Sequence, residues 1–182
     1  MALTPEAIAE AAMRILADFG LGDLTMRRLA RDLEVRPSAL YWHVADKQSL
    51  FVLLAERMAA EADSTPSPAA PATDTARIEA LMTYRRVLLA YRESADIVLL
   101  AYAHSGPSVL PASLRRLDAR LRDTVTPFVL GSIAIQQTRS LFAESGLGPE
   151  PGGAPLAEQT EGGPGAEAEA SFRTGLARLL TQ

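Results

Sequence analysis

Three adjacent aromatic side chains with polar atoms, Tyr41, Trp42 and His43, stand out in the stretch RPSALYWHVADK at residues 36–47. Neighbouring residues of a helix point in different directions, so at least one of these rings must face outward. Exposed ring edges could lie against the sugar-phosphate backbone or thymine methyl groups of DNA. They could also pack at a junction between domains or contact a protein partner.

Basic and hydroxyl side chains surround the three rings. Residues 25–47 contain four Arg and one Lys against two Asp and one Glu, a local charge of +2 in a chain whose net charge is −4. Arg27 and Arg36 could make bidentate hydrogen bonds to guanine. Ser38, Tyr41 and Lys47 have polar tips suited to phosphate oxygens. This composition suits DNA binding by residues 25–47, although charge clusters of this size also arise by chance.

Residues for catalysis or metal binding are scarce. The chain has no Cys and only two His, which excludes thiol chemistry and a His-rich metal centre. The Gly-rich segment 145–165 lacks the Gly-Lys-Ser/Thr ending of a phosphate-binding loop. A triad of His43, Asp46 and a Ser can be assembled only inside the aromatic segment itself. We therefore expect no enzyme activity, no cofactor and no metal.

Capping residues and apolar spacing predict helices along the whole chain, and no segment shows the alternation of a strand. The expected helices cover residues 5–19, 25–33, 37–44, 46–62, 75–92, 96–103, 111–123, 127–144 and 167–180. The fold class is therefore all-α with about nine helices. Residues 25–33 and 37–44, separated by a short turn, form a helix-turn-helix whose second helix can enter the major groove.

Composition divides the chain into four parts. We expect a helix-turn-helix domain at 1–45, a connecting helix at 46–63, a Pro/Ser/Ala hinge at 64–74 and a second helical domain at 75–182, with a flexible loop at 145–165. The start has no signal-peptide pattern, and charges interrupt the most apolar stretch. A soluble protein of the cytoplasm is the expectation.

The stretch LTMRRLARDLEVRPSALYWHVADKQSL, residues 24–50, resembles the DNA-binding domain of the tetracycline repressor (TetR) family. YRRVLLAYRESADIVL, residues 84–99, resembles the start of the ligand-binding domain in the tetracycline-repressor subgroup. The resemblance implies a homodimeric repressor that binds a palindromic operator and a small inducer. It also implies that Arg27 reads a base and that Thr25, Tyr41 and Lys47 hold phosphates. The implied recognition surface consists of Arg36, Pro37, Ser38, Trp42 and His43.

Several positions depart from the tetracycline repressor. Pro37-Ser38-Ala39 replaces a Gln-Pro-Thr run, so the Gln that would read a base is missing and we expect a different operator. Val98 stands where the family subgroup has its metal-binding His, and Ala80 where an Asn anchors the drug. Magnesium–tetracycline is therefore not the expected inducer.

The remaining candidate pocket is mostly apolar and suits a largely apolar effector held by two or three hydrogen bonds. Its candidate residues are Tyr84, Leu88, Tyr91, Val98, Tyr102, Phe128 and Gln136. Each of these could equally be an ordinary core residue. His104 could contact a ligand or cap the end of its helix.

Helices 127–144 and 167–180 are the candidates for a dimer interface, where two copies would form a four-helix bundle. In this hypothesis two recognition helices lie about 34–36 Å apart, and an effector changes that arrangement through helix 46–62. Two alternatives stay open. The rings at 41–43 could bind a protein, as in a helical adaptor, or the ligand could promote DNA binding instead of releasing it.

Overall fold

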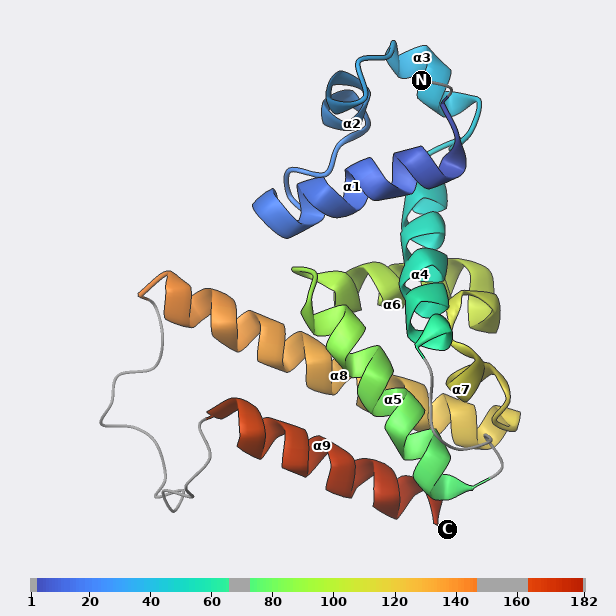
Figure 1. Ribbon diagram of the computed structural model, residues 1–182, viewed down its shortest axis with the longest axis vertical. Helices are drawn as coiled ribbons and strands as arrows, with labels where there is room; N and C mark the ends of the chain where they lie inside the picture. Colours follow the sequence, from blue (N-terminus) through green and yellow to red (C-terminus); the bar gives the residue numbers. More distant parts are fainter. Residues whose placement is uncertain (1–2, 66–72, 147–163, 182) are drawn as a thin grey trace.

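The computed structural model describes residues 3–65, 73–146 and 164–181, and within them the fold is all-α, as predicted. Figure 1 shows a small group of helices at one end, a long helix leading away from it, and a larger group of helices at the other end. The described helices are α1 (Pro5–Phe19), α2 (Met26–Asp32), α3 (Pro37–Tyr41), α4 (Lys47–Ser64), α5 (Asp74–Leu89), α6 (Ser94–Ser105), α7 (Ala112–Arg115), α8 (Ala119–Glu144) and α9 (Pro164–Leu180), with a 3-10 turn, η1 (Gly106–Val109), before α7.

Helices α1, α2 and α3 form what we call the head. Two of its helices begin at threonine caps. The hydroxyl oxygen of Thr4 accepts a hydrogen bond from the Ala7 amide at 3.2 Å, and that of Thr25 accepts one from the Arg28 amide at 3.1 Å. Leu16, Leu29 and Leu40, one from each helix, are completely buried. The three helices therefore share one apolar centre.

The turn between α2 and α3 closes with the hydrogen bonds of a Schellman motif. The Val35 amide donates to the Ala30 carbonyl at 2.9 Å, and the Glu34 amide donates to the Arg31 carbonyl at 3.2 Å. Glu34 takes the left-handed conformation that usually belongs to glycine here, with φ 55°. This turn sets the angle between the two helices of the helix-turn-helix.

Helix α4 connects the head to the body, which we define as α5–α9 (Figure 1). It begins at Asp46, whose Oδ1 accepts hydrogen bonds from the Ser49 amide at 2.7 Å and the Ser49 hydroxyl at 2.8 Å. Hydrogen bonds from Ser49 lower the pKa of Asp46. Leu50, Leu54 and Met58 are buried along its length, so head, α4 and body share a continuous core.

The predicted helices 111–123 and 127–144 are wrong in their boundaries. Helix α7 ends at Arg115, and a new helix, α8, begins after Asp118, whose Oδ1 accepts from the Leu121 amide at 3.0 Å. Helix α8 then runs through Pro127. Proline in a helix interior costs about 3 kcal/mol. Val125 and Val129 on either side of Pro127 are completely buried, so packing against the body holds the helix across it.

Other boundaries differ by a few residues. The second helix of the helix-turn-helix ends at Tyr41 instead of residue 44, although the Val44 amide still donates to the Leu40 carbonyl at 2.8 Å. Helix α6 is longer than the predicted 96–103 because it begins after Glu93. Both ends of the predicted hinge 64–74 are helical, and residues 66–72 lie outside the described part. Most of the predicted loop 145–165, namely 147–163, lies outside it too.

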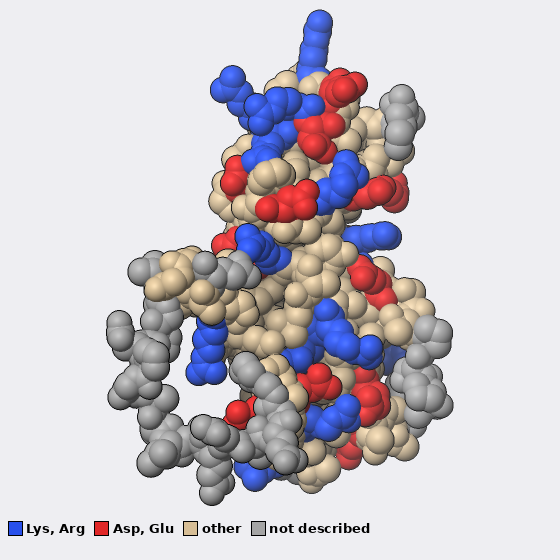
Figure 2. Space-filling view, turned by 60° about the vertical axis from the view of Figure 1, so that its left-hand side comes forward, with Lys and Arg blue, Asp and Glu red and all other residues tan. Residues whose placement is uncertain are grey.

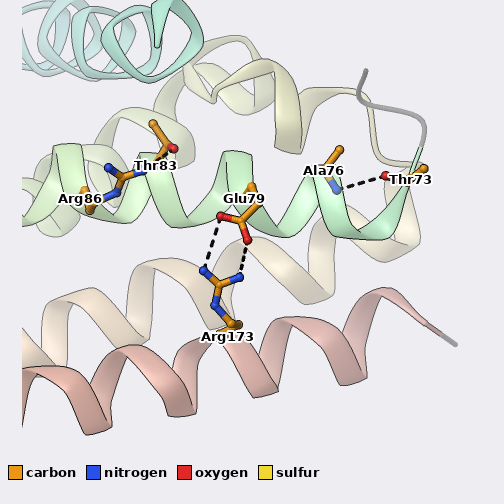
Figure 3. Close-up of polar contacts among 6 residues, drawn as sticks. All are labelled: Thr73, Ala76, Glu79, Thr83, Arg86 and Arg173. Carbon is orange, nitrogen blue, oxygen red and sulfur yellow. Dashed lines mark hydrogen bonds and ion pairs between the residues drawn. The ribbon is translucent and has the colours of Figure 1, made fainter. Parts of the chain in front are cut away.

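Helix α9 packs against α8 and α5 in the body (Figure 1). The rings of Phe128 and Phe172 stack with their centroids 5.6 Å apart. Arg173 forms an ion pair with both carboxylate oxygens of Glu79 on α5 (Figure 3). Helix α5 itself starts at Thr73, whose hydroxyl accepts from the Ala76 amide (Figure 3). Among the described helices, none combines the length and apolar character needed to cross a bilayer.

Candidate functional site

All three rings of the aromatic segment face outward. Trp42 is 89% exposed and Tyr41 51% exposed, and His43 is exposed as well. Between them and the core lie Leu40 and Val44, which are buried as their spacing predicts. Because Trp42 meets almost no protein, the rings do not pack at a junction between domains. They form a surface available to a partner.

Exposed arginines lie close to the rings in sequence. Arg27, Arg31 and Arg36 are exposed, and none of them forms an ion pair with another described residue. Arg28 differs, because it pairs with Asp23 and its guanidinium lies 3.8 Å from the centre of the Phe19 ring. Figure 2 shows Lys and Arg side chains projecting from the head end of the molecule. The head therefore presents three arginines that form no ion pair with another described residue and that are close in sequence to the exposed rings, while Asp and Glu side chains lie at the same end of the molecule (Figure 2).

The other predicted DNA-binding residues lie at the starts of α2, α3 and α4. Pro37 and Ser38 are exposed in the first turn of α3. Thr25 is exposed, and its hydroxyl caps α2. Lys47 is half-buried in the first turn of α4, with its ammonium nitrogen 5.5 Å from the centre of the Phe51 ring. Exposed Arg27 stands one residue inside the start of α2.

A polar contact joins the head to the body, and sequence reasoning missed it. Glu93, in the turn between α5 and α6, accepts a hydrogen bond from the Leu21 amide at 2.6 Å through its Oε2. That oxygen lies 2.7 Å from the position that a Cβ on Gly20 would occupy. Gly20 also has φ +80°, where glycine is favoured. The two residues therefore allow the head loop to approach the body closely.

Gln137 on α8 fixes the turn that carries Glu93. Its side-chain nitrogen donates to the Tyr91 carbonyl at 2.7 Å and to the Leu88 carbonyl at 3.2 Å. It also lies 3.1 Å from the Ser94 hydroxyl, which donates to the Leu88 carbonyl. The orientation of the α5–α6 turn therefore depends on α8.

The predicted ligand-binding residues fall into three groups. Tyr84, Leu88 and Val98 are completely buried, whereas Tyr91, Tyr102, Phe128 and Gln136 are partly buried and His104 is exposed. The Tyr84 hydroxyl has no hydrogen-bond partner among the described residues, and burial raises the pKa of this group. An unpaired buried hydroxyl costs about 1–3 kcal/mol, so it is a natural contact for a polar ligand atom.

A cleft of about 420 Å³ opens between α5, α8 and α9. Of the predicted ligand residues, Gln136 lines it, and Phe128 stacks on Phe172 in its wall. Sequence reasoning missed Arg85, which also lines it and is only 4% exposed. The signal was present, because Arg85 falls on the helical stripe of buried residues formed by Leu81, Tyr84 and Leu88. Nowhere in the described residues do three or more His, Asp or Glu gather as a metal site would require.

Two short helices joined by the Schellman turn define a helix-turn-helix protein. The outward rings lie at the end of the second helix, and the arginines that form no ion pair with a described residue lie on the first helix and directly before the second. A family model for "Bacterial regulatory proteins, tetR family" matches residues 8–54, which include all of α1, α2 and α3 except the first turn of α1. The chain belongs to this family, which confirms the resemblance found in the sequence.

Known relatives agree with this assignment. The class C tetracycline repressor of Escherichia coli is 37% identical over 122 residues, which are 66% of this chain and 52% of that protein. The chain thus spans about half the length of the tetracycline repressor that it matches. The crystal structure of Mycobacterium smegmatis BioQ is 30% identical with a TM-score of 0.75, and the match covers 98% of this chain and 96% of BioQ. BioQ bound to its double-stranded DNA operator is 28% identical with a TM-score of 0.68, covering 98% and 96%.

Proposed function

We propose that this protein is a homodimeric transcriptional regulator that binds a palindromic DNA operator and is released by a small effector. The observation that carries the proposal is the exposed surface of the head, where Tyr41, Trp42 and His43 stand beside Arg27 and Arg36. The family assignment and the operator complex of BioQ support it. Members of the family are transcriptional regulators rather than enzymes, and we place this one in the cytoplasm with its DNA.

The role of each head residue follows from its chemistry. Arg27 reads a base by bidentate hydrogen bonds, while Tyr41 and Lys47 contact phosphates. The Thr25 hydroxyl, already an acceptor in the cap of α2, can donate its own proton to a phosphate oxygen. The rest of the recognition surface consists of Arg36, Pro37, Ser38, Trp42 and His43. The proposed parts of the chain are the helix-turn-helix domain 1–45, the connecting helix 46–63, the hinge 64–74, whose two end residues are helical, and the ligand-binding and dimerisation domain 75–182.

The proposed dimer interface uses α8 and α9. Ile135 and Phe142 on α8 are 56% and 49% exposed. They are two helical turns apart and so lie on one face, where a second copy would bury them. Two copies paired through α8 and α9 would form a four-helix bundle and hold the two heads about 34–36 Å apart, one turn of DNA.

The effector acts from the body. It binds beside α5, α6 and α8, where the buried hydroxyl of Tyr84 has no hydrogen-bond partner in the described part of the chain. It favours an arrangement of the heads that fits the operator poorly. Such a ligand can shift the population only by its difference in affinity for the two arrangements. Tyr84, Leu88, Tyr91, Val98, Tyr102, His104, Phe128 and Gln136 are the proposed contacts.

The test is selection of a binding site from genomic fragments, followed by a salt titration of binding to that site. We expect a palindrome and a steep loss of affinity with salt, because phosphate contacts release counterions. Arg27→Ala should weaken binding about 5- to 150-fold, the equivalent of about 1–3 kcal/mol. Arg120→Ala, which removes an exposed arginine at the start of α8 in the body, is the matched control and should bind like wild type.

Two results would contradict the proposal. If no site is enriched, or if binding does not depend on salt, the exposed rings serve a protein partner, as in a helical adaptor. If Arg27→Ala binds as well as Arg120→Ala, direct base reading by Arg27 is wrong. An effector that strengthens operator binding would reverse the direction of regulation without changing the DNA-binding assignment.

A further inference from the structure

Arg85 is a buried positive charge without a described counter-charge. Its side chain is on the inward stripe of α5, and the residue is only 4% exposed. One guanidinium nitrogen donates to Gln136 Oε1, a neutral acceptor, and the guanidinium carbon lies 5.3 Å from the centre of the Phe172 ring. No described carboxylate lies within ion-pair distance of it.

Burying an arginine in this way is costly. A buried charge normally has an oppositely charged partner, because neutral contacts do not replace the water that it loses. Burial lowers the pKa of Arg85, whereas the charge of Glu169 on α9, which is exposed, raises it. Gln136 and the Phe172 ring leave other donors of the five-donor guanidinium fork available.

The cleft around Arg85 has the residues that a negatively charged ligand would need. The cleft of about 420 Å³ between α5, α8 and α9 is lined by a second arginine, Arg139, and by the hydroxyls of Ser132 and Ser140. Ala168 and Phe172 supply apolar walls, whereas Ile135, which also lines the cleft, lies on the face of α8 that the proposed dimer buries. None of the described side chains that line the cleft is acidic. Its volume suits a small organic molecule.

We propose that this cleft binds an organic carboxylate, with the acid group held by Arg85 and Arg139 and the apolar part against Ala168 and Phe172. Arginine favours carboxylates because its planar fork offers two parallel hydrogen bonds. The cleft shares Gln136 with the contacts proposed for the effector, whereas Tyr84 is not among the residues that line it.

The cleft is connected to the head. Gln136 and Ser140 also line a second cleft, of about 390 Å³, which reaches Ala17 of α1 and Glu93. Gln136, the partner of Arg85, precedes Gln137, which holds the α5–α6 turn, and Glu93 in that turn accepts from Leu21 of the head. A carboxylate that draws Arg85 away from Gln136 would therefore disturb α8 next to Gln137. Through the α5–α6 turn, this disturbance would reach the hydrogen bond between Glu93 and Leu21 of the head. This coupling rests on the proposed function, whereas binding itself does not.

The test is calorimetric titration of the purified dimer with phenylacetate and octanoate, each compared with its neutral amide, phenylacetamide or octanamide. We expect the carboxylates to bind at least about tenfold more tightly than the amides, because a charged hydrogen bond is worth that factor. Arg139→Gln, at an exposed position, should weaken carboxylate binding several-fold, and Arg85→Gln should weaken it about tenfold or more. Arg86→Gln removes the same charge from the adjacent, exposed position and should bind like wild type.

The proposal is overturned if wild type binds neither carboxylate, if the amides bind equally well, or if Arg139→Gln matches Arg86→Gln. Because Arg139 is exposed, that comparison stands even if Arg85→Gln does not fold. Loss of the dimer in Arg139→Gln, without carboxylate binding to wild type, would show that a second copy supplies the counter-charge. If an operator is selected but no carboxylate binds, only the carboxylate site is refuted. If a carboxylate binds but no operator is selected, only the proposed DNA-binding function is refuted.

Discussion

The contact between Glu93 and the head can be tested with an internal control. Glu93 and Glu34 are the two described non-glycine residues with positive φ, at 54° and 55°. Glu93 Oε2 accepts the Leu21 amide at 2.6 Å, whereas the Glu34 carboxylate makes no hydrogen bond or ion pair with another described residue. Substitution by alanine leaves the same backbone strain at both sites. Only at position 93 does it also remove a hydrogen bond between the head and the body.

The magnitude follows from the geometry. A hydrogen bond to a charged group contributes about 1.5–3 kcal/mol, and the Leu21 amide loses this acceptor when Glu93 is truncated. Because Leu21 and Glu93 are only half-buried, water can hydrogen-bond to the freed Leu21 amide and compensates part of the lost free energy. We expect Glu93→Ala to lower the free energy of unfolding by about 1–2 kcal/mol. Glu34→Ala, at an exposed residue, should change it by less than about 0.5 kcal/mol.

Urea denaturation of wild type and both variants measures this difference. The midpoint should fall in Glu93→Ala at an unchanged dependence of free energy on urea, since the surface exposed on unfolding is the same. Hydrogen exchange at the Leu21 amide gives a local readout and should accelerate in Glu93→Ala only. Equal losses of stability in Glu93→Ala and Glu34→Ala would refute the assignment of this contact as a link between head and body.

Two further predictions concern α9. A Cβ on Gly175 would lie 2.3 Å from Phe128 Cζ, so Gly175→Ala should destabilise the protein by about 1–3 kcal/mol in urea. Gly131→Ala is the control, because a Cβ at this position would meet nothing within 4 Å. The higher helix propensity of alanine should stabilise α8 by about 0.5–1 kcal/mol. An equal change in stability at both sites would contradict the close packing of Gly175 against Phe128. The hydrogen bond from Arg173 lowers the pKa of Glu79 below its usual 4.5, so the pair stabilises the fold above that pH and loses its effect as pH falls through the lower, folded-state pKa. Arg173→Gln should therefore be less stable than wild type near neutral pH, by up to about 1 kcal/mol for this exposed pair, and the difference should shrink towards pH 3 in acid melts; a difference independent of pH would argue against the pair.

Local physics made much of the fold predictable. Thr25 and Asp46 cap helices as their positions before helical stretches predict, because a cap involves atoms only three residues apart. The orientation of the rings also depends partly on neighbouring residues in the sequence. Leu40 and Val44 are buried, and four residues of spacing between them place at least one of Tyr41, Trp42 and His43 away from the core, although α3 itself ends at Tyr41. The arginines near the rings in sequence and the all-α class therefore follow from the sequence alone, whereas the sequence required only one ring to face outward and the structure shows that all three do.

Helix α8 shows where local reasoning fails. Pro127 predicts a helix boundary, because it lacks an amide proton. The boundary lies instead at Asp118, and the helix continues through Pro127 with Val125 and Val129 buried on either side. The free energy of burying those side chains outweighs the local cost, and it depends on neighbours that the sequence does not place.

Tertiary structure alone decided how the head and body meet and what surrounds Arg85. Glu93 and Leu21 are 72 positions apart, and Arg85 and Gln136 are 51 positions apart. Sequence periodicity assigns each residue to a face of its own helix, but the partner on the opposite face is set by how helices cross and how closely they approach. Gly175, which admits the ring of Phe128, and Gly20, which admits the carboxylate of Glu93, fix two of those approaches. The sequence thus determined that the helix-turn-helix is the surface for a partner. Packing determined that the positive charge of Arg85 is buried without a counter-charge among the described residues.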